Sequence, residues 1–319
     1  MGLQDVRKRA GGALIRGSLT SLTHMMRLHP KARALLKKVS VESDVSYGAD
    51  DVPAHILDVY RPRHLDGPLP TLLYIHGGGF RILSKDTHWM MNALFAMQGF
   101  TVFSVNYRLV PEDPFPAGLT DVFQAARWIQ KHGAEYGADL SRWVVAGESA
   151  GANLTCALSI ANCTKRPEAW AAEIYDLNLP IQAILPACGI LEVANSGRFK
   201  ARKPKLSTLL ADRIGMVCDQ YLAGHETPEL ASPITILESD WVADRPFPPT
   251  MAICGTKDPI LDDTRRLGSA LSARGVSNQI EIYEGGLHAF HAAFWTPRSI
   301  KAWEAQYAFL DEHVPNRLQ

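Results

Sequence analysis

The pentapeptide Gly147-Glu148-Ser149-Ala150-Gly151 is the stretch whose residue types and spacing most clearly predict chemistry. It follows the apolar run 143–146 and is followed at once by a helix-forming run, so the sequence predicts a strand, a sharp turn and a helix with Ser149 at the apex. The flanking glycines fit a backbone bend too tight for side chains. Helix N-terminal amides would point at the serine. This placement favours Ser149 as a nucleophile.

A serine nucleophile needs a base to take its proton and a third group to orient that base. The predicted strand 250–254 ends before Asp258, and the predicted strand 279–283 ends before His288. Both residues would therefore lie at the carboxyl ends of parallel strands, as Ser149 does. We predict Ser149, Asp258 and His288 as the catalytic residues.

Each partner has rivals nearby. Asp262 and Asp263 precede a predicted helix and are interpreted as its caps, and Glu284 is an acid on the same loop as His288. His291 is a second histidine and is interpreted as a surface residue. The two histidines lack a third ligand in the sequence pattern, so no metal is predicted.

Three consecutive glycines follow the apolar run 70–75, in His76-Gly77-Gly78-Gly79-Phe80. Glycine amides are free to turn inward and can stabilise the oxyanion of an acyl-transfer transition state, with the amide of Ala150 as a further donor. A phosphate-binding loop would need a following Lys-Ser/Thr or the G-x-G-x-x-G spacing, and neither is present.

The elements that must position these residues alternate between strand and helix, which predicts an α/β fold around a mostly parallel sheet. The predicted strands cover residues 41–47, 54–60, 70–75, 100–105, 143–146, 181–185, 250–254 and 279–283. The predicted helices between them cover residues 90–97, 119–131, 152–162, 263–274 and 299–313. Residues 1–38 read as amphipathic helices, and the mixed segment 189–248 has helical patches near 205–222. The sheet does not need these two segments, so they are expected to form a cap.

Composition excludes several classes of function. Lys and Arg together number 33 and equal Asp and Glu at 33, so no global charge directs the chain to nucleic acid. No run of eighteen apolar residues occurs, which predicts no integral membrane association. The five cysteines are scattered and form no C-x-x-C pair, which predicts free thiols and a cytoplasmic location. The basic residues of the first forty positions are interpreted as a solvated helix face.

Taken together, the motifs resemble the hormone-sensitive-lipase-like family of α/β-hydrolase carboxylesterases. The similarity covers about residues 45 to 315 and rests on five segments in the family's order: 76–80, 107–117, the elbow 147–151, 258–262 and 288–290. It implies an α/β-hydrolase fold with an eight-stranded, mostly parallel sheet in a single domain spanning residues 1–319. The cap would come from residues 1–40 and about 189–248.

The resemblance also implies the roles of the site residues. Ser149 would be the nucleophile, His288 the base and Asp258 its orienting acid. The oxyanion hole would comprise Gly77, Gly78, Gly79 and Ala150, with Gly77 shaping the loop and the other three donating. Glu148 stands where the family usually has Asp or Thr, and is expected to support the loop.

The function implied is hydrolysis of short- to medium-chain carboxylic esters through an acyl-enzyme, without a cofactor. The apolar residues Phe80, Leu287 and Phe290 are predicted to contact the substrate. The partner would be a small-molecule ester, and because family members often dimerise, a homodimer is also an expectation. An amidase or formamidase using the same triad, and a non-catalytic small-molecule receptor, are the alternatives.

Overall fold

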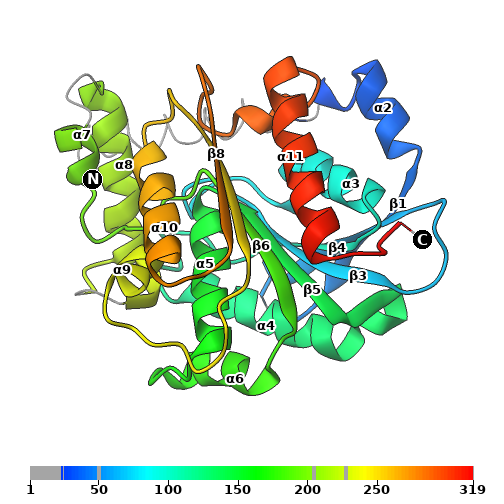
Figure 1. Cartoon of the computed structure of the whole chain (residues 1–319), viewed down its shortest axis with the longest axis horizontal. Helices are drawn as coiled ribbons and strands as arrows, with labels where there is room; N and C mark the ends of the chain where they lie inside the picture. Colours follow the sequence, from blue (N-terminus) through cyan, green and yellow to red (C-terminus); the bar gives the residue numbers. More distant parts are fainter. Residues whose placement is uncertain (1–22, 24, 49–51, 203–205, 226–228, 319) are drawn as a thin grey trace.

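The computed structural model describes residues 23, 25–48, 52–202, 206–225 and 229–318. The expected amphipathic helices of residues 1–22 lie outside the described residues. A single eight-stranded sheet runs through the molecule, flanked by helices (Figure 1). Its strands are β1 (Val39–Ser46), β2 (Ile56–Pro62), β3 (Leu69–Ile75), β4 (Thr101–Val105), β5 (Ala138–Glu148), β6 (Ile181–Ala187), β7 (Thr250–Gly255) and β8 (Asn278–Tyr283).

The helices of the main body fall between these strands. They are α2 (Pro30–Leu36), α3 (Trp89–Met97), α4 (Ala117–His132), α5 (Ala150–Cys163), α6 (Ala169–Leu177), α10 (Leu261–Ala273) and α11 (Pro297–His313). Within residues 189–248 the structure forms α7 (Arg198–Arg202), α8 (Thr208–Leu222) and α9 (Pro233–Glu238). Short 3₁₀ turns occur at η1 (Lys85–His88), η2 (Gly133–Tyr136), η3 (Glu229–Ala231) and η4 (Phe290–Ala292).

The strand order is β1-β2-β4-β3-β5-β6-β7-β8. β2 pairs antiparallel with both β1 and β4, whereas every pairing from β4 through to β8 is parallel. Only β2 therefore runs against the others, and the predicted eight-stranded, mostly parallel sheet is confirmed. Parallel strands place their carboxyl ends at one edge, which is where the loops after β3, β5, β7 and β8 emerge.

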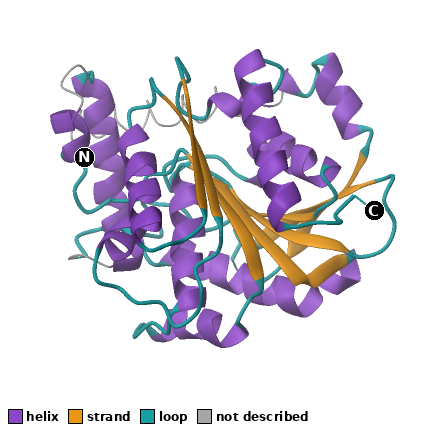
Figure 2. Ribbon diagram, viewed as in Figure 1, coloured by secondary structure: helices purple, strands orange, loops and turns teal. Residues whose placement is uncertain are grey.

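Both faces of the sheet are covered, as Figure 2 shows. The buried strand β3 illustrates why: Leu72 and Tyr74 pack into one apolar cluster, while Leu73 and Ile75 pack into the other. Residues of α3 and α11 complete the first cluster, and residues of α4, α5 and α10 complete the second. Continuous apolar runs such as 70–75 are what a strand buried on both faces requires.

Within the main body, β5 and α6 differ clearly from the sequence prediction. β5 begins at Ala138, five residues earlier than predicted, because three of the four residues 139–142 are polar and hide a segment that still pairs with β3 through Leu69↔Ala138. Helix α6 was not predicted; only Ala171 and Ile174 are buried in it, which gives a short apolar stripe that is hard to recognise.

The helices of segment 189–248 pack against the main body. Leu230, Ile234 and Leu237 are buried in the same apolar cluster as α5 and α10, and this cluster also includes Phe199 of α7 and Tyr221 of α8. Helices α7 and α8 lie at the edge of the molecule (Figure 1). A buried ion pair between Arg198 of α7 and Asp263 of α10 joins the segment to the main body, with an oxygen–nitrogen distance of 2.5 Å. No helix among the described residues is both long and apolar enough to cross a membrane.

Candidate active site

Ser149 lies at the junction between β5 and α5 in a backbone conformation that only a tight turn produces. Its φ is 57° and its ψ is −111°, which is strained for a residue with a side chain. A Cβ on Gly151 would lie 2.0 Å from the carbonyl oxygen of Ile75, and a Cβ on Gly147 would lie 2.5 Å from that of Gly151. Both glycines are therefore required by close backbone approaches.

The structure brings the three predicted side chains into one hydrogen-bonded chain. Nε2 of His288 lies 3.0 Å from Oγ of Ser149, and Nδ1 of His288 lies 2.8 Å from Oδ2 of Asp258. Ser149 and Asp258 are buried, at 8% and 0% exposure, while the His288 side chain is 36% exposed. This is the arrangement in which an imidazole can accept a hydroxyl proton at one nitrogen while a carboxylate fixes its other nitrogen as the donor.

Glycine contacts hold the loops of Asp258 and His288 together. The N–H of Lys257 donates to the carbonyl oxygen of Gly286 at 2.9 Å, and a Cβ on Gly255 would lie 2.1 Å from that oxygen. Asp258 and His288 are thus positioned as one unit. Gly255 at the end of β7 and Gly286 after β8 are required because the two backbones approach too closely for a side chain.

The surroundings of His288 make its imidazole more basic than usual. Burial alone would lower its pKa, but the charge of Asp258, the hydrogen bond that His288 donates to Asp258 and the charge of Glu148 outweigh it and raise the pKa above the ordinary value. An imidazole of this kind is suited to accept a proton from a hydroxyl held against it.

The rival acids have other partners. Asp263 is fully buried in the first turn of α10, where it accepts the Leu191 N–H and pairs with Arg198. The N-cap of α10 is Ile260, so the interpretation of Asp262 and Asp263 as caps is wrong. The helix begins earlier than predicted, and Asp263 forms an ion pair with the buried Arg198. Glu284 is exposed.

His291 is a correction to the sequence interpretation. It is only 3% exposed, not a surface residue, and its Nε2 lies 3.3 Å from Oε2 of Glu148. His291 lies in the short turn η4 and is its buried residue, which the sequence spacing does not reveal. Burial, the largest influence, lowers the pKa of His291, so its ring is neutral near pH 7.

Glu148 and His88 form a buried polar pair that sequence reasoning missed. Oε1 of Glu148 lies 3.6 Å from Nε2 of His88, which comes from η1. Burial would raise the pKa of Glu148, but contacts with His88, and then the fields of His291 and His288, lower it to about 2. A glutamate directly before the nucleophile was the only sequence signal for this charge.

The glycine loop 77–79 presents free amides. Gly78 and Gly79 have φ values of +117° and +61°, and a Cβ on Gly78 would lie 1.9 Å from the Ile82 carbonyl oxygen. Among the described residues, no acceptor pairs with the N–H groups of Gly78, Gly79 or Ala150. The N–H of Gly77 instead points to Nε2 of His88 at 3.4 Å. Three unpaired amides beside a serine are suited to bind an oxyanion.

The apolar residues predicted to contact substrate lie in different environments. Phe80 is 1% exposed, and its ring stacks on Tyr221 of α8 with centroids 3.7 Å apart. Leu287 is 63% exposed, and Phe290 is half-buried with its ring 5.2 Å from that of Tyr283. Val217 of α8 lies close over Gly79, where a Cβ would meet it at 3.2 Å.

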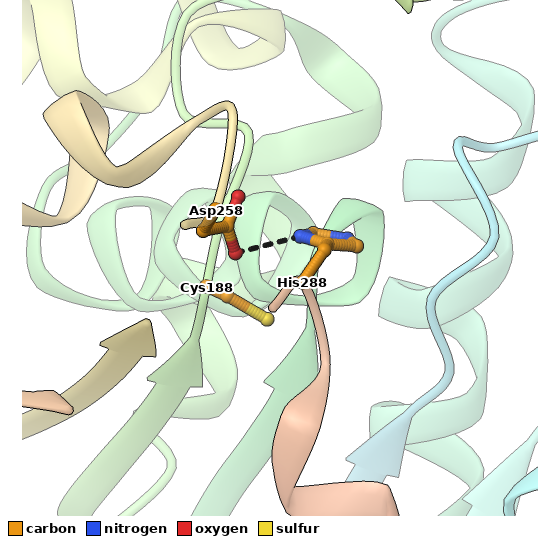
Figure 3. A group of neighbouring side chains, drawn as sticks. All are labelled: Cys188, Asp258 and His288. Carbon is orange, nitrogen blue, oxygen red and sulfur yellow. Dashed lines mark hydrogen bonds and ion pairs between the residues drawn. The ribbon is translucent and has the colours of Figure 1, made fainter. Parts of the chain in front are cut away.

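Cys188, which follows β6, lies beneath the acid–base pair (Figure 3). Its sulfur, a carboxylate oxygen of Asp258 and a ring nitrogen of His288 lie within 4.8 Å of one another, a spacing that three metal ligands could have. Burial raises the pKa of the Cys188 thiol well above its ordinary value, and the other two atoms share a hydrogen bond. A protonated thiol is a poor metal ligand, so the group fits an acid–base pair better than a metal centre.

A hydroxyl held against an imidazole–carboxylate pair, at the carboxyl edge of a mostly parallel sheet and beside a loop of free amides, defines the class of α/β hydrolases. A family model described as alpha/beta hydrolase fold matches residues 72–292. The chain belongs to this family, and the family and fold predicted from its motifs are confirmed.

The relatives are esterases by name. The chain is 32% identical over 229 residues to Esterase LipI of Mycobacterium tuberculosis, covering 69% of this chain and 65% of that protein. It is 40% identical over 128 residues to Carboxylesterase NlhH of the same species, covering 39% of each chain. The solved esterase LipW from Mycobacterium marinum superposes with a TM-score of 0.76 at 24% identity, covering 95% of this chain and 90% of that one, which shows the shared fold.

Proposed function

We propose that this protein is a serine carboxylesterase that hydrolyses short- to medium-chain carboxylic esters. The observation that carries the proposal is the chain of contacts from Ser149 Oγ to His288 Nε2 at 3.0 Å and from His288 Nδ1 to Asp258 at 2.8 Å. The naming of LipI and NlhH as an esterase and a carboxylesterase supports the same reaction class.

The first half of the reaction acylates the serine. Ser149 Oγ attacks the ester carbonyl carbon while His288 Nε2 accepts the hydroxyl proton, and Asp258 stabilises the imidazolium that forms. As the tetrahedral intermediate collapses, the carbon–oxygen bond to the alcohol breaks and His288 gives its proton to the leaving alcohol. In the second half, His288 deprotonates a water molecule, which attacks the acyl-enzyme and releases the carboxylic acid, and the proton returns to Ser149.

Charge on the carbonyl oxygen develops in both halves. We assign its binding to the N–H groups of Gly78, Gly79 and Ala150, which have no other acceptor among the described residues. Gly77 contributes by shaping the loop, because its N–H is directed at His88. Donors of this kind act without reorganising, which is why they stabilise the transition state more than water does.

The substrate would bind under a cap. We propose that residues 1–40 and about 189–248 supply this cap on a single catalytic domain of residues 1–319. The contacts of Tyr221 with Phe80 and of Val217 with Gly79 support a position of α8 over the oxyanion loop. The exposed Leu287 offers apolar surface for the acyl or alcohol group, in keeping with an uncharged ester.

Five buried cysteines, all unpaired, support a reducing and hence cytoplasmic location. We propose a small-molecule ester as the partner and a homodimer as the assembly, for which size-exclusion chromatography with light scattering is the test.

The decisive experiment is turnover of a series of p-nitrophenyl esters from acetate to decanoate, paired with labelling by a fluorophosphonate. We expect hydrolysis with a maximum at short to medium chains and stoichiometric labelling. A matched anilide series measures amidase activity; faster turnover of anilides than of esters would replace the proposal with an amidase. Tight ligand binding without turnover or labelling would replace it with a receptor.

A further inference from the structure

We propose that Glu148 is a positioning residue that joins the nucleophile turn to the loops of the oxyanion donors and of the base. Its charge also contributes, after that of Asp258, to the raised pKa of His288. The inference rests on the proposed function, since it concerns the same site. Glu148 immediately precedes Ser149 in the sequence. Its side chain is only 6% exposed and faces two other segments of the chain.

On one side Glu148 supports the glycine loop. Its Oε1 lies 3.6 Å from Nε2 of His88, and the N–H of Gly77 is directed at the same nitrogen at 3.4 Å. A Cβ on Gly77 would lie 3.0 Å from Oε1 and 2.7 Å from the Glu148 carbonyl oxygen, so the loop packs directly against this residue. His88 is itself held, because its Nδ1 lies 3.1 Å from the Ser84 carbonyl oxygen. Glu148 therefore packs directly against the start of the loop that presents the amides of Gly78 and Gly79.

On the other side Glu148 supports the loop of the base. Its Oε2 lies 3.3 Å from Nε2 of His291, three positions beyond His288. His291 is buried, and the Nε1–H of Trp303 on α11 donates to its carbonyl oxygen at 3.1 Å. The two carboxylate oxygens thus face different imidazoles, and Oε2 has no hydrogen-bond partner among the described residues. One side chain links three separate segments that must keep their spacing within a fraction of an ångström for reaction.

Few other charged groups lie close enough to Glu148 to change the electrostatic effect of its carboxylate on His288. Titratable side chains from several segments face Glu148. They are Tyr74 of β3, His76 directly after β3, His88 of η1, Tyr107 after β4, Cys188 after β6, and His288 and His291 after β8. Burial raises the pKa of Tyr74, Tyr107 and Cys188 and lowers that of His76 and His291, so these five are neutral near pH 7. Glu148 and Asp258 are then the carboxylates that act on His288.

The test compares Glu148→Gln, Glu148→Asp and the control Glu284→Gln, which removes an exposed carboxylate four residues before His288. The readouts are kcat, KM and the pH dependence of kcat/KM on p-nitrophenyl butyrate. Glu148→Gln keeps the shape and removes the charge. We expect kcat to fall about 10- to 100-fold with KM little changed, and the acid limb of kcat/KM to move to lower pH, because the imidazolium loses a stabilising charge.

Glu148→Asp keeps the charge but is one methylene too short to reach both His88 and His291. We expect its acid limb to stay with that of the wild type while kcat falls, and Glu284→Gln to match the wild type in both. Equal kcat and equal acid limbs in Glu148→Gln and the wild type would overturn the inference. So would a loss of kcat without any shift of the limb in Glu148→Gln, since that marks a structural role only.

Glu148→Asp keeps the inference testable if Glu148→Gln does not fold, because an unchanged kcat in this variant would also overturn it. Wild-type protein that fails to hydrolyse any ester refutes the proposed function instead, so the two failures are distinguishable.

Discussion

Nε2 of His288 lies 3.0 Å from Oγ of Ser149, although 139 positions separate the two residues. Ser149 follows β5 and His288 follows β8, and β6 and β7 lie between these strands in the sheet. Neighbouring strands are about 4.8 Å apart, so the two strand ends are roughly 14 Å apart. The loop after β8 therefore reaches back across two strands, over Asp258 after β7 and Cys188 after β6.

Replacing the proposed nucleophile should abolish most turnover. Ser149→Ala removes the hydroxyl that attacks the ester, and we expect kcat to fall roughly 10³-fold or more. Hydrolysis of p-nitrophenyl butyrate and fluorophosphonate labelling measure the effect. Turnover equal to that of the wild type would assign the activity to another group.

Replacing the orienting acid should be nearly as severe. Asp258→Asn leaves the volume unchanged but favours the wrong imidazole tautomer, and we expect a loss of about 10⁴-fold in kcat by analogy with other triads. Glu284→Gln is the matched control, because Glu284 is the exposed carboxylate on the same loop as the base. A larger loss in Glu284→Gln than in Asp258→Asn would reverse the assignment of the acid.

The pH profile should report the raised pKa of His288. The imidazole must be neutral to accept the Ser149 proton, so kcat/KM should fall as the pH drops through the pKa of His288. Burial opposes this shift, but Asp258 and Glu148 raise the pKa above 6.5, so the half-maximal point of the acid limb should lie above 6.5 as well. A midpoint below that value would contradict the stabilisation of the imidazolium by Asp258 and Glu148.

The oxyanion loop should not tolerate a side chain at Gly78. A Cβ there would lie 1.9 Å from the Ile82 carbonyl oxygen, so Gly78→Ala must displace the loop. We expect kcat to fall by about 10²-fold, comparable to the loss of an oxyanion donor. The control is Gly67→Ala, where φ is +76° and no atom lies within 4 Å, so the backbone strain occurs without a clash. Similar kcat values in the two variants would argue against the role of this loop.

The buried pair of Arg198 and Asp263 should matter for stability. Asp263→Ala leaves the Arg198 guanidinium buried beside the lost carboxylate, and we expect the free energy of unfolding to fall by about 3–5 kcal/mol. The exposed pair Arg127–Glu173 is the control, and Glu173→Ala should cost at most about 1 kcal/mol. Urea denaturation followed by circular dichroism measures both, and equal effects would contradict the burial argument.

Much of the fold was predictable because its signals are local. Apolar runs such as 70–75 indicated strands buried on both faces, and the glycines around Ser149 indicated a tight turn, since sterics act over a few residues. β5 was underestimated because three of the four residues 139–142 are polar, and α6 was missed because it buries only two side chains. Apolar pattern alone carries no information on either.

The sequence by itself determined which residue types were available for chemistry and the order in which strands would bring them to one edge of the sheet. Only the tertiary structure decided the partners of the polar groups around the predicted triad. In the folded chain His291 is buried against Glu148, Asp263 pairs with Arg198, and the Gly77 amide points to His88. These contacts join segments far apart in the chain, and their existence depends on the packing of loops between strands, for which neither residue spacing nor periodicity is a measure.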